Sequence, residues 1–258
     1  MQARALFTAA ALAAAAIASP VYAQDNAAPK DTTKGFYMTA GAGGSWAGSA
    51  NTTYNNPTFQ YGGTTYGSSG SITGNTPLSG GVAVEAGAGY DFGNNIRAEL
   101  TYLYNNMSLS ASSLNLNTTL SGTRYTGSIN PNTSGSASTN SVMLSGYYDI
   151  QTKTKFTPYV GAGIGYTSVS LPSQNRVGGT YTINGTSGND GWIDYAGGSG
   201  SAFGYQAKVG VSYAVSKPAD VYLEGTYQGN TGTTISNLNL SALNLFGVRA
   251  GFRYRFGS

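Results

Sequence analysis

The sequence predicts an all-β fold, an eight-stranded antiparallel transmembrane β-barrel with short periplasmic turns and four long extracellular loops. Three observations predict it. Eight runs of about ten residues alternate between apolar and polar or tiny side chains, which is the pattern of barrel strands in a bilayer. Short and long connections alternate between these runs. Charged residues make up only 9% of the chain, against about 25% in soluble domains, which fits an outer face in contact with hydrocarbon.

The first 23 residues are predicted to be a cleaved secretory signal peptide. Arg4 supplies a positive charge, Ala5 to Ile17 form an apolar segment, and the small-x-small pattern at Val21-Tyr22-Ala23 marks a cleavage site before Gln24. The segment is short for a membrane-spanning helix. We therefore expect a short periplasmic tail at residues 24–34, followed by a single barrel domain at residues 35–258.

Each expected strand separates an apolar face from a polar or glycine-rich face, because side chains alternate along a strand. The expected strands are residues 35–44, 82–91, 96–104, 141–149, 156–167, 203–213, 221–228 and 246–256. The apolar members of the first four are Phe36, Met38, Ala40 and Ala42; Val82, Val84, Ala86, Ala88 and Tyr90; Ile96, Ala98, Leu100, Tyr102 and Tyr104; and Val142, Leu144 and Tyr148. Those of the last four are Pro158, Val160, Ala162, Ile164 and Tyr166; Phe203, Tyr205, Ala207, Val209, Val211 and Tyr213; Val221, Leu223 and Tyr227; and Phe246, Val248, Ala250, Phe252, Tyr254 and Phe256.

The connections set the orientation of the barrel. Those at residues 92–95, 151–155 and 216–219 are short, and short turns face the periplasm in this class of protein. The four long connections, expected to face outward, are residues 45–81, 105–140, 168–201 and 229–244. A closed barrel is required because unpaired backbone groups cannot be left in hydrocarbon.

Most charges within the strands fall on the face opposite the apolar one. The resulting candidate lumenal charge network is Glu85, Arg97, Glu99, Lys208, Glu224, Arg249 and Arg253. Folding the turn about residue 216 places Lys208 opposite Glu224, and folding about residue 93 places Arg97 and Glu99 opposite glycines. A satisfied salt-bridge network that fills a narrow lumen is the favoured interpretation, because both signs of charge are available. A selectivity filter or a proton-linked gate is the alternative.

The sequence gives little support for an enzymatic function. Histidine and cysteine are both absent, which excludes Ser-His and Cys-His nucleophilic sites. A carboxylate pair of Glu85 and Glu99 is a formal option, but nearby cations favour a structural role. Asp190 and Asp194 are too few carboxylates for a usual calcium site. We expect no catalytic residues, no cofactor and no metal, and the small net charge of +3 does not indicate nucleic acid.

The long connections are nearly uncharged and contain aromatic residues among Asn, Thr, Ser and Gly. The candidate interaction aromatics are Tyr54, Phe59, Tyr61, Tyr66 and Trp192. This composition resembles that of recognition loops, in which rigid aromatics supply contact area. Low-complexity coil that solvates the barrel mouth is an equally favoured interpretation. Asn184-Gly185 predicts the turn of a small hairpin within the third connection.

Three segments, T-P-Y-V-G-A-G-I-G-Y, G-Y-Q-A-K-V-G-V-S-Y and the terminal G-V-R-A-G-F-R-Y-R-F, resemble the OmpA-like/opacity-type outer-membrane β-barrel family of Gram-negative bacteria. The alternating Phe252, Tyr254 and Phe256 are similar to the signal that the barrel-assembly machinery reads. The resemblance implies location in the cell outer membrane, with outer-membrane lipid, lipopolysaccharide, the assembly machinery and host or matrix surface molecules as partners. It implies a non-enzymatic surface antigen with an adhesin-like or envelope-stabilising role; a small-solute porin with a narrow polar lumen is the alternative.

Overall fold

A computed structural model describes residues 34–67, 70–120, 123–172, 176–194 and 197–256. The predicted signal peptide, and all but the last residue of the predicted periplasmic tail, lie outside these residues. The described chain forms eighteen β-strands. No helix long and apolar enough to cross a membrane occurs in the described residues.

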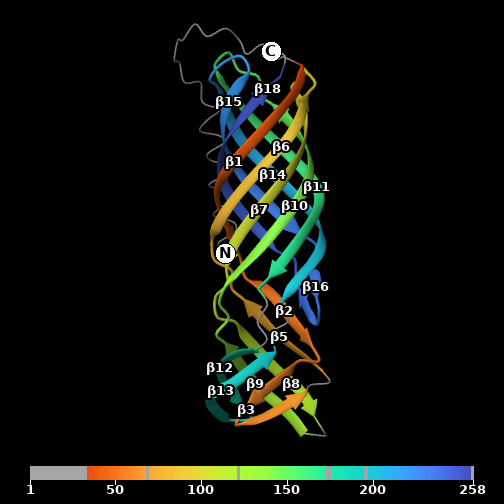
Figure 1. Ribbon diagram of the computed structural model, residues 1–258, viewed down its shortest axis with the longest axis vertical. Helices are drawn as coiled ribbons and strands as arrows, with labels where there is room; N and C mark the ends of the chain where they lie inside the picture. Colours follow the sequence, from red (N-terminus) through yellow and green to blue (C-terminus); the bar gives the residue numbers. More distant parts are fainter. Residues whose placement is uncertain (1–33, 68–69, 121–122, 173–175, 195–196, 257–258) are drawn as a thin grey trace.

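Eight strands form a closed antiparallel barrel, which confirms the predicted fold class (Figure 1). They are β1 (Gly35–Ala47), β6 (Gly81–Asp91), β7 (Ile96–Ser108), β10 (Ser136–Asp149), β11 (Phe156–Leu171), β14 (Gly198–Ala214), β15 (Ala219–Asn230) and β18 (Asn244–Arg255). The barrel closes because β1 pairs with β6 on one side and with β18 on the other. No strand of this sheet is therefore left with an unpaired edge in the membrane.

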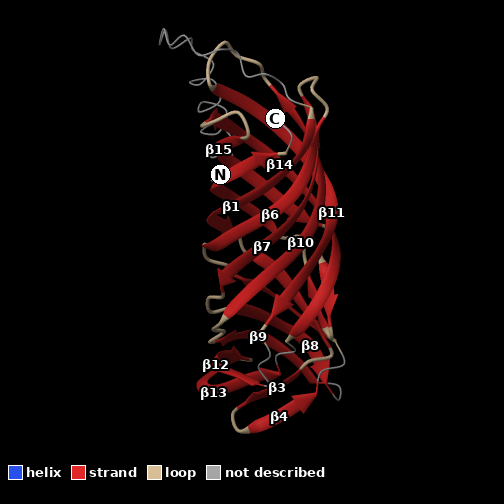
Figure 2. Cartoon of the chain, turned by 45° about the horizontal axis from the view of Figure 1, so that its top comes forward, coloured by secondary structure: helices blue, strands red, loops and turns tan. Residues whose placement is uncertain are grey.

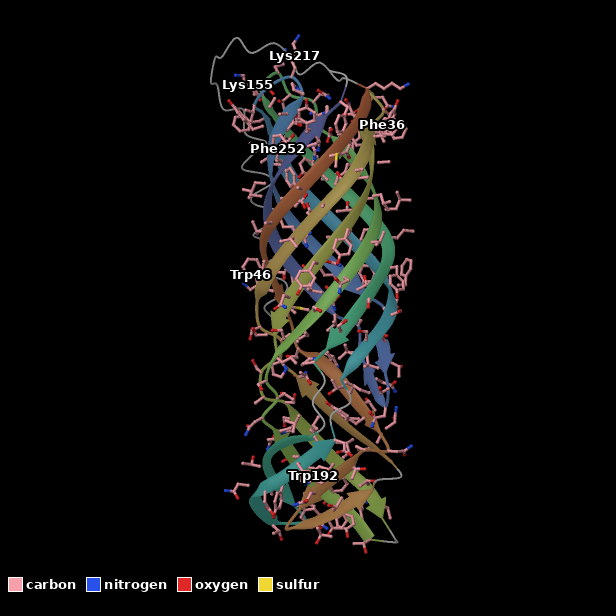
Figure 3. The ribbon with its side chains drawn as sticks, viewed as in Figure 1. Phe36, Trp46, Lys155, Trp192, Lys217 and Phe252 are labelled. Atoms are coloured by element: carbon pink, nitrogen blue, oxygen red, sulfur yellow. The ribbon has the colours of Figure 1, made fainter. Side chains whose placement is uncertain are left out.

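The outer face of the barrel is apolar, as the alternation predicts. Phe36, Met38 and Phe252 are 68%, 57% and 46% exposed on it. Figure 3 shows Phe36 and Phe252 near the end that carries the turns with Lys155 and Lys217, and Trp46 at the opposite end of the barrel. The exposed apolar side chains thus cover the barrel wall between a charged periplasmic rim and Trp46.

Four tyrosines on the inner face lie over glycines of the neighbouring strand. The cross-strand pairs are Tyr37 with Gly89, Tyr147 with Gly161, Tyr159 with Gly210 and Tyr222 with Gly251. A Cβ atom on any of these glycines would lie 2.2–2.5 Å from the tyrosine ring. The lumen is too narrow for a large residue at both positions, so the glycine-rich runs serve packing.

Two turns fold one residue later than predicted. Glu99 pairs with Gly89 and Arg97 with Asp91, so the expected pairing of Arg97 with Gly89 and of Glu99 with Gly87 is wrong. Lys208 pairs with Thr226, and Glu224 with Gly210. The reason lies in the turn chemistry: Gly93 and Asn95 have positive φ angles of 78° and 70°, which centre the first turn on Asn94. Each register shifts by two residues, so every side chain keeps its predicted face.

The long connections fold into a second sheet, which we call the extension (Figure 2). Its strands are β2 (Ala50–Asn55), β3 (Thr58–Tyr61), β4 (Thr64–Gly67), β5 (Ser71–Thr76), β8 (Ser113–Leu120), β9 (Thr123–Pro131), β12 (Arg176–Ile183), β13 (Thr186–Asp194), β16 (Thr233–Ile235) and β17 (Leu238–Leu240). Their order is β16-β17-β2-β5-β8-β9-β12-β13-β3-β4. The interpretation of these connections as low-complexity coil is therefore wrong, because their alternating Leu, Ile and Tyr residues give each strand an apolar face.

The inward face of the extension forms one hydrophobic core. Its fully buried members include Phe59, Ile72, Leu114, Ile129 and Ile183. The predicted turn at Asn184-Gly185 is confirmed: both residues have positive φ angles, 47° and 81°, and they join β12 to β13. Such a turn matches the twist of paired strands.

Candidate functional site: the lumen and the extension

Four charged side chains from four strands meet at the middle of the lumen. Lys208 Nζ lies 2.9 Å from Glu85 Oε2 and 3.0 Å from Glu224 Oε1. Arg249 Nη1 lies 3.0 Å from the same oxygen of Glu85. The hydroxyl of Tyr222 donates a hydrogen bond of 2.9 Å to Glu85 Oε1. All four charged side chains are buried, so each one requires the others to offset the loss of water.

A second cluster surrounds Arg97, which is completely buried. Its Nε and Nη2 atoms donate to the two oxygens of Asp149 at 2.8 and 2.9 Å, and Nη1 donates to the hydroxyl of Tyr37 at 3.2 Å. The guanidinium also lies 4.6 Å from the ring centre of Tyr147. This two-pronged pairing suits arginine and not lysine, since only the planar guanidinium can meet both oxygens at once.

The periplasmic end of the lumen holds two further arginines. Arg255 Nη1 lies 2.6 Å from Asp220 Oδ2, and Arg253 Nη1 lies 3.5 Å from the same oxygen. Arg253 also lies between tyrosine rings, with its Cζ 5.4 Å from the ring centre of Tyr37 and 5.6 Å from that of Tyr222. Such contacts with aromatic faces stabilise a cation that is removed from water.

The structure brings six of the seven predicted lumenal residues into ion pairs with one another or with aspartates. Glu99 differs, because it accepts hydrogen bonds from Thr101 and from Tyr147 at 2.9 and 3.0 Å. Sequence reasoning left Asp149 and Asp220 out of the network. Asp149 was on the inward face of its predicted strand, but Asp220 lies one residue before the predicted start of the seventh strand, so its face was not assigned.

Above the charged layers, the lumen contains amides and hydroxyls, and then aliphatic side chains. Asn105 donates to Gln228 at 3.0 Å, and Gln228 donates to Ser141 at 2.8 Å. Met107 and Leu245 lie higher on their strands, are buried, and belong to the core of the extension. The lumen is thus packed from the ion pairs up to the extension. A catalytic carboxylate would need access to substrate, but Glu85 is enclosed and bound by Lys208 and Arg249.

The predicted interaction aromatics lie mostly inside the extension. Tyr54 and Phe59 are 1% and 0% exposed. Tyr61 and Tyr66 are half-buried, with stacked rings whose centres are 4.9 Å apart. Burial, together with a hydrogen bond to Tyr66, raises the pKa of Tyr61 above that of a free tyrosine. Trp192 donates a hydrogen bond to Gln60 and so joins β13 to β3.

The remaining candidates have surface positions. Phe252, Tyr254 and Phe256 are 46%, 42% and 49% exposed on the outer face at the end of β18. Asp190, considered above for calcium, accepts a hydrogen bond of 3.0 Å from the backbone N–H of Gly63. Within the described residues, no three metal-binding side chains of the His, Cys, Asp and Glu types gather together.

Comparison with known proteins assigns the chain to a family. A family model described as "Surface antigen" matches residues 49–251. The chain is similar to solved structures of Neisserial surface protein A (17% identity, 86% of this chain and 97% of that chain, TM-score 0.45) and of the outer membrane protein OprG from Pseudomonas aeruginosa (14%, 87% and 97%, TM-score 0.42). It is also similar to that of the outer membrane protease OmpT from Escherichia coli (11%, 85% and 97%, TM-score 0.48). Curated proteins give no match. Because the matched segment spans most of the sequence, the chain belongs to the Surface antigen family.

Proposed function

We propose that this surface protein of the outer membrane is non-enzymatic and acts through the extension. It holds the extension rigidly outside the cell for surface interaction or envelope integrity. The observation that carries this proposal is the packed core of the extension above a packed lumen. Strands β7, β10, β11 and β14 run without interruption from the barrel wall to the start of the extension, so they support it as a continuous stalk.

The same observation disfavours the porin alternative. A conducting lumen needs a continuous polar path, but fully buried Arg97 and Arg249 cross it and buried Met107 and Leu245 lie above them. We expect purified protein in a planar bilayer to give no discrete conductance steps. A known trimeric porin, inserted by the same procedure, is the positive control. Reproducible steps from this protein would overturn the proposal of a closed lumen.

The surface role needs a variant that removes the whole extension. Deleting one or two connections would expose the shared core, because residues from all four connections contribute to it. A barrel-only variant should therefore replace residues 48–80, 109–135, 172–197 and 231–243 with short turns. We expect it to keep heat-modifiable gel mobility, the sign of a folded barrel, while cells that display it lose attachment to matrix or retain fewer envelope components. Unchanged attachment and unchanged envelope integrity together would contradict the proposed role.

Two exposed surfaces of the barrel predict contacts with partners in the envelope. We propose that the apolar band around Phe36 and Phe252 contacts outer-membrane lipid, since both side chains lie exposed on the barrel wall. We propose that Phe252, Tyr254 and Phe256 act as the assembly signal. Their exposure on the outer face at the end of β18 supports this role, because a receptor can read them before the barrel closes.

A further inference from the structure

The outward face of the extension carries an unbroken row of uncharged hydrogen-bonding side chains, which we call the ladder. Cross-strand pairing places one member on each of eight neighbouring strands, in the order Thr234, Asn239, Thr53, Thr73, Asn115, Ser128, Thr182 and Ser187. All eight are exposed or half-buried on the side away from the core. Neighbouring strands lie about 4.8 Å apart, so the ladder presents hydroxyl and amide groups at a regular spacing.

A second row runs beside the ladder. Asn51, Asn75 and Ser113 are cross-strand neighbours, and Asn75 Nδ2 donates to Asn51 Oδ1 at 3.3 Å. Both rows line an open hollow of about 460 Å³ on strands β2, β5 and β8. Each amide offers a donor and an acceptor, and each hydroxyl can be either. The hollow is therefore a surface for a ligand rich in groups that both donate and accept, which is the property of a sugar.

Charge narrows the choice of partner. Residues 45–81 and 229–244 contain no charged residue, and residues 105–140 contain only Arg124, which is engaged with Asn117 at 3.1–3.2 Å. Residues 168–201 contain Arg176, Asp190 and Asp194, none of which is a member of the ladder. An exposed antiparallel face in a soluble domain is usually rich in lysine and glutamate. A phosphate, a sulfate or an acidic peptide would find no cation on the ladder. An uncharged ligand does not need a cation, so the absence of one does not weaken its binding.

The extent of the ladder narrows the choice further. The strands that carry it all send apolar residues into one core, so their outward faces surround that core. A folded protein partner would reach one side of such a surface only. Sugar chains of neighbouring lipopolysaccharide molecules reach every side of a barrel in the outer leaflet, at the level just above its apolar band. We propose that the ladder binds the uncharged sugar residues of surrounding lipopolysaccharide, a proposal that rests on the outward placement of the extension in the proposed function.

The test uses the full-length protein in detergent and a lipid-free, uncharged polysaccharide released from the lipopolysaccharide of the producing bacterium. The ladder variant is Thr53→Val, Thr73→Val and Thr182→Val, which removes three hydroxyls and keeps the β-branched shape. The matched control is Thr58→Val, Thr65→Val and Thr119→Val, at outward positions off the ladder. We expect the ladder variant to bind at least about tenfold more weakly, since three hydrogen bonds to the sugar are lost together. The control should bind as the unmodified protein does.

Two further arms define the ligand. Binding should be unchanged by 0.5 M salt and by EDTA, because no phosphate or bridging cation takes part, and micelles of lipid A without sugar chains should not compete. Equal binding by the ladder and control variants, loss of binding in salt, or competition by lipid A micelles would overturn the proposal. Gel mobility shows that the barrel of both variants is folded, and slow amide hydrogen exchange in β5 and β8 shows that their extension is folded as well. A failed binding test with a non-conducting lumen refutes the ladder alone, whereas conductance steps refute the closed lumen of the proposed function.

Discussion

Replacing Lys208 by methionine should strongly lower the free energy of unfolding of the barrel. Most of this loss should come from one carboxylate, Glu224, which would lose its ion-pair partner. Lys208 is the ion-pair partner of Glu224 within the described residues, at 3.0 Å. Glu85 would keep Arg249 at 3.0 Å and the hydroxyl of Tyr222 at 2.9 Å. Glu224 would keep only a hydroxyl, that of Tyr159 at 3.0 Å, among its described contacts. A buried charge that loses its partner costs about 3–5 kcal/mol.

That magnitude makes the effect easy to measure. With a urea dependence of about 2 kcal/mol per M, the unfolding midpoint should fall by roughly 1.5–2.5 M. The assay is urea unfolding in lipid vesicles, followed by tryptophan fluorescence and by gel mobility. Adding Glu224→Gln to Lys208→Met should recover most of the loss, because it removes the unpaired charge. Adding Glu85→Gln should recover much less, since it would leave Arg249 without its carboxylate.

The two double variants decide the outcome. If Lys208→Met alone shifts the free energy of unfolding by less than about 1 kcal/mol, the ion pair is not a buried one of the usual strength. If both double variants are equally stable, the assignment of the loss to Glu224 is wrong. Unfolding of unmodified protein in the same vesicles is the reference for every comparison.

Three smaller perturbations test the other parts of the structure. Arg97→Lys should cost about 1–3 kcal/mol in urea unfolding, because lysine cannot bond both oxygens of Asp149; an unchanged midpoint would contradict the two-pronged pairing. Leu114→Ala should destabilise the extension by about 2–5 kcal/mol and alter Trp192 fluorescence while barrel gel mobility persists; loss of that mobility would show that the two parts unfold together. Gly185→Ala should speed amide hydrogen exchange in the β12–β13 hairpin, because φ is 81° there; equal exchange would place the turn elsewhere.

Sequence reasoning was accurate where one physical rule covers a whole strand. The alternation from Phe36 onward predicted every barrel strand and the face of every charge within the expected strands, since hydrocarbon outside and ion pairs inside leave little freedom. The predicted register of strand pairing was less accurate. Shifting a strand by two residues preserves both faces, so the pattern alone could not distinguish the pairing of Glu99 with Gly87 from its pairing with Gly89. The turn geometry at Gly93 and Asn95 decides that question.

The extension could not be predicted from the same rule, because the apolar face of a strand changes sides along its length. In the barrel the outward face is apolar, and in the extension the inward face is apolar. On β7 the odd-numbered residues face inward from Arg97 to Met107, but the inward side changes from charged to apolar on the way. The even-numbered side changes from Leu100 and Tyr102 to Asn106. A pattern of apolar residues on the outward face ends where that face becomes polar. The third expected strand therefore ended at residue 104.

The inversion has a physical cause and a structural consequence. Within the membrane the solvent outside is hydrocarbon, and above it the solvent is water, so the same outward face must change from Leu100 to Asn106. The hydrogen-bonded backbone does not have to change, and it continues from barrel to extension through β7, β10, β11 and β14. A core enclosed by such strands cannot move as separate loops would. The outward face of the extension is therefore held at a fixed height and orientation above the membrane, which is the condition that a regular array such as the ladder requires.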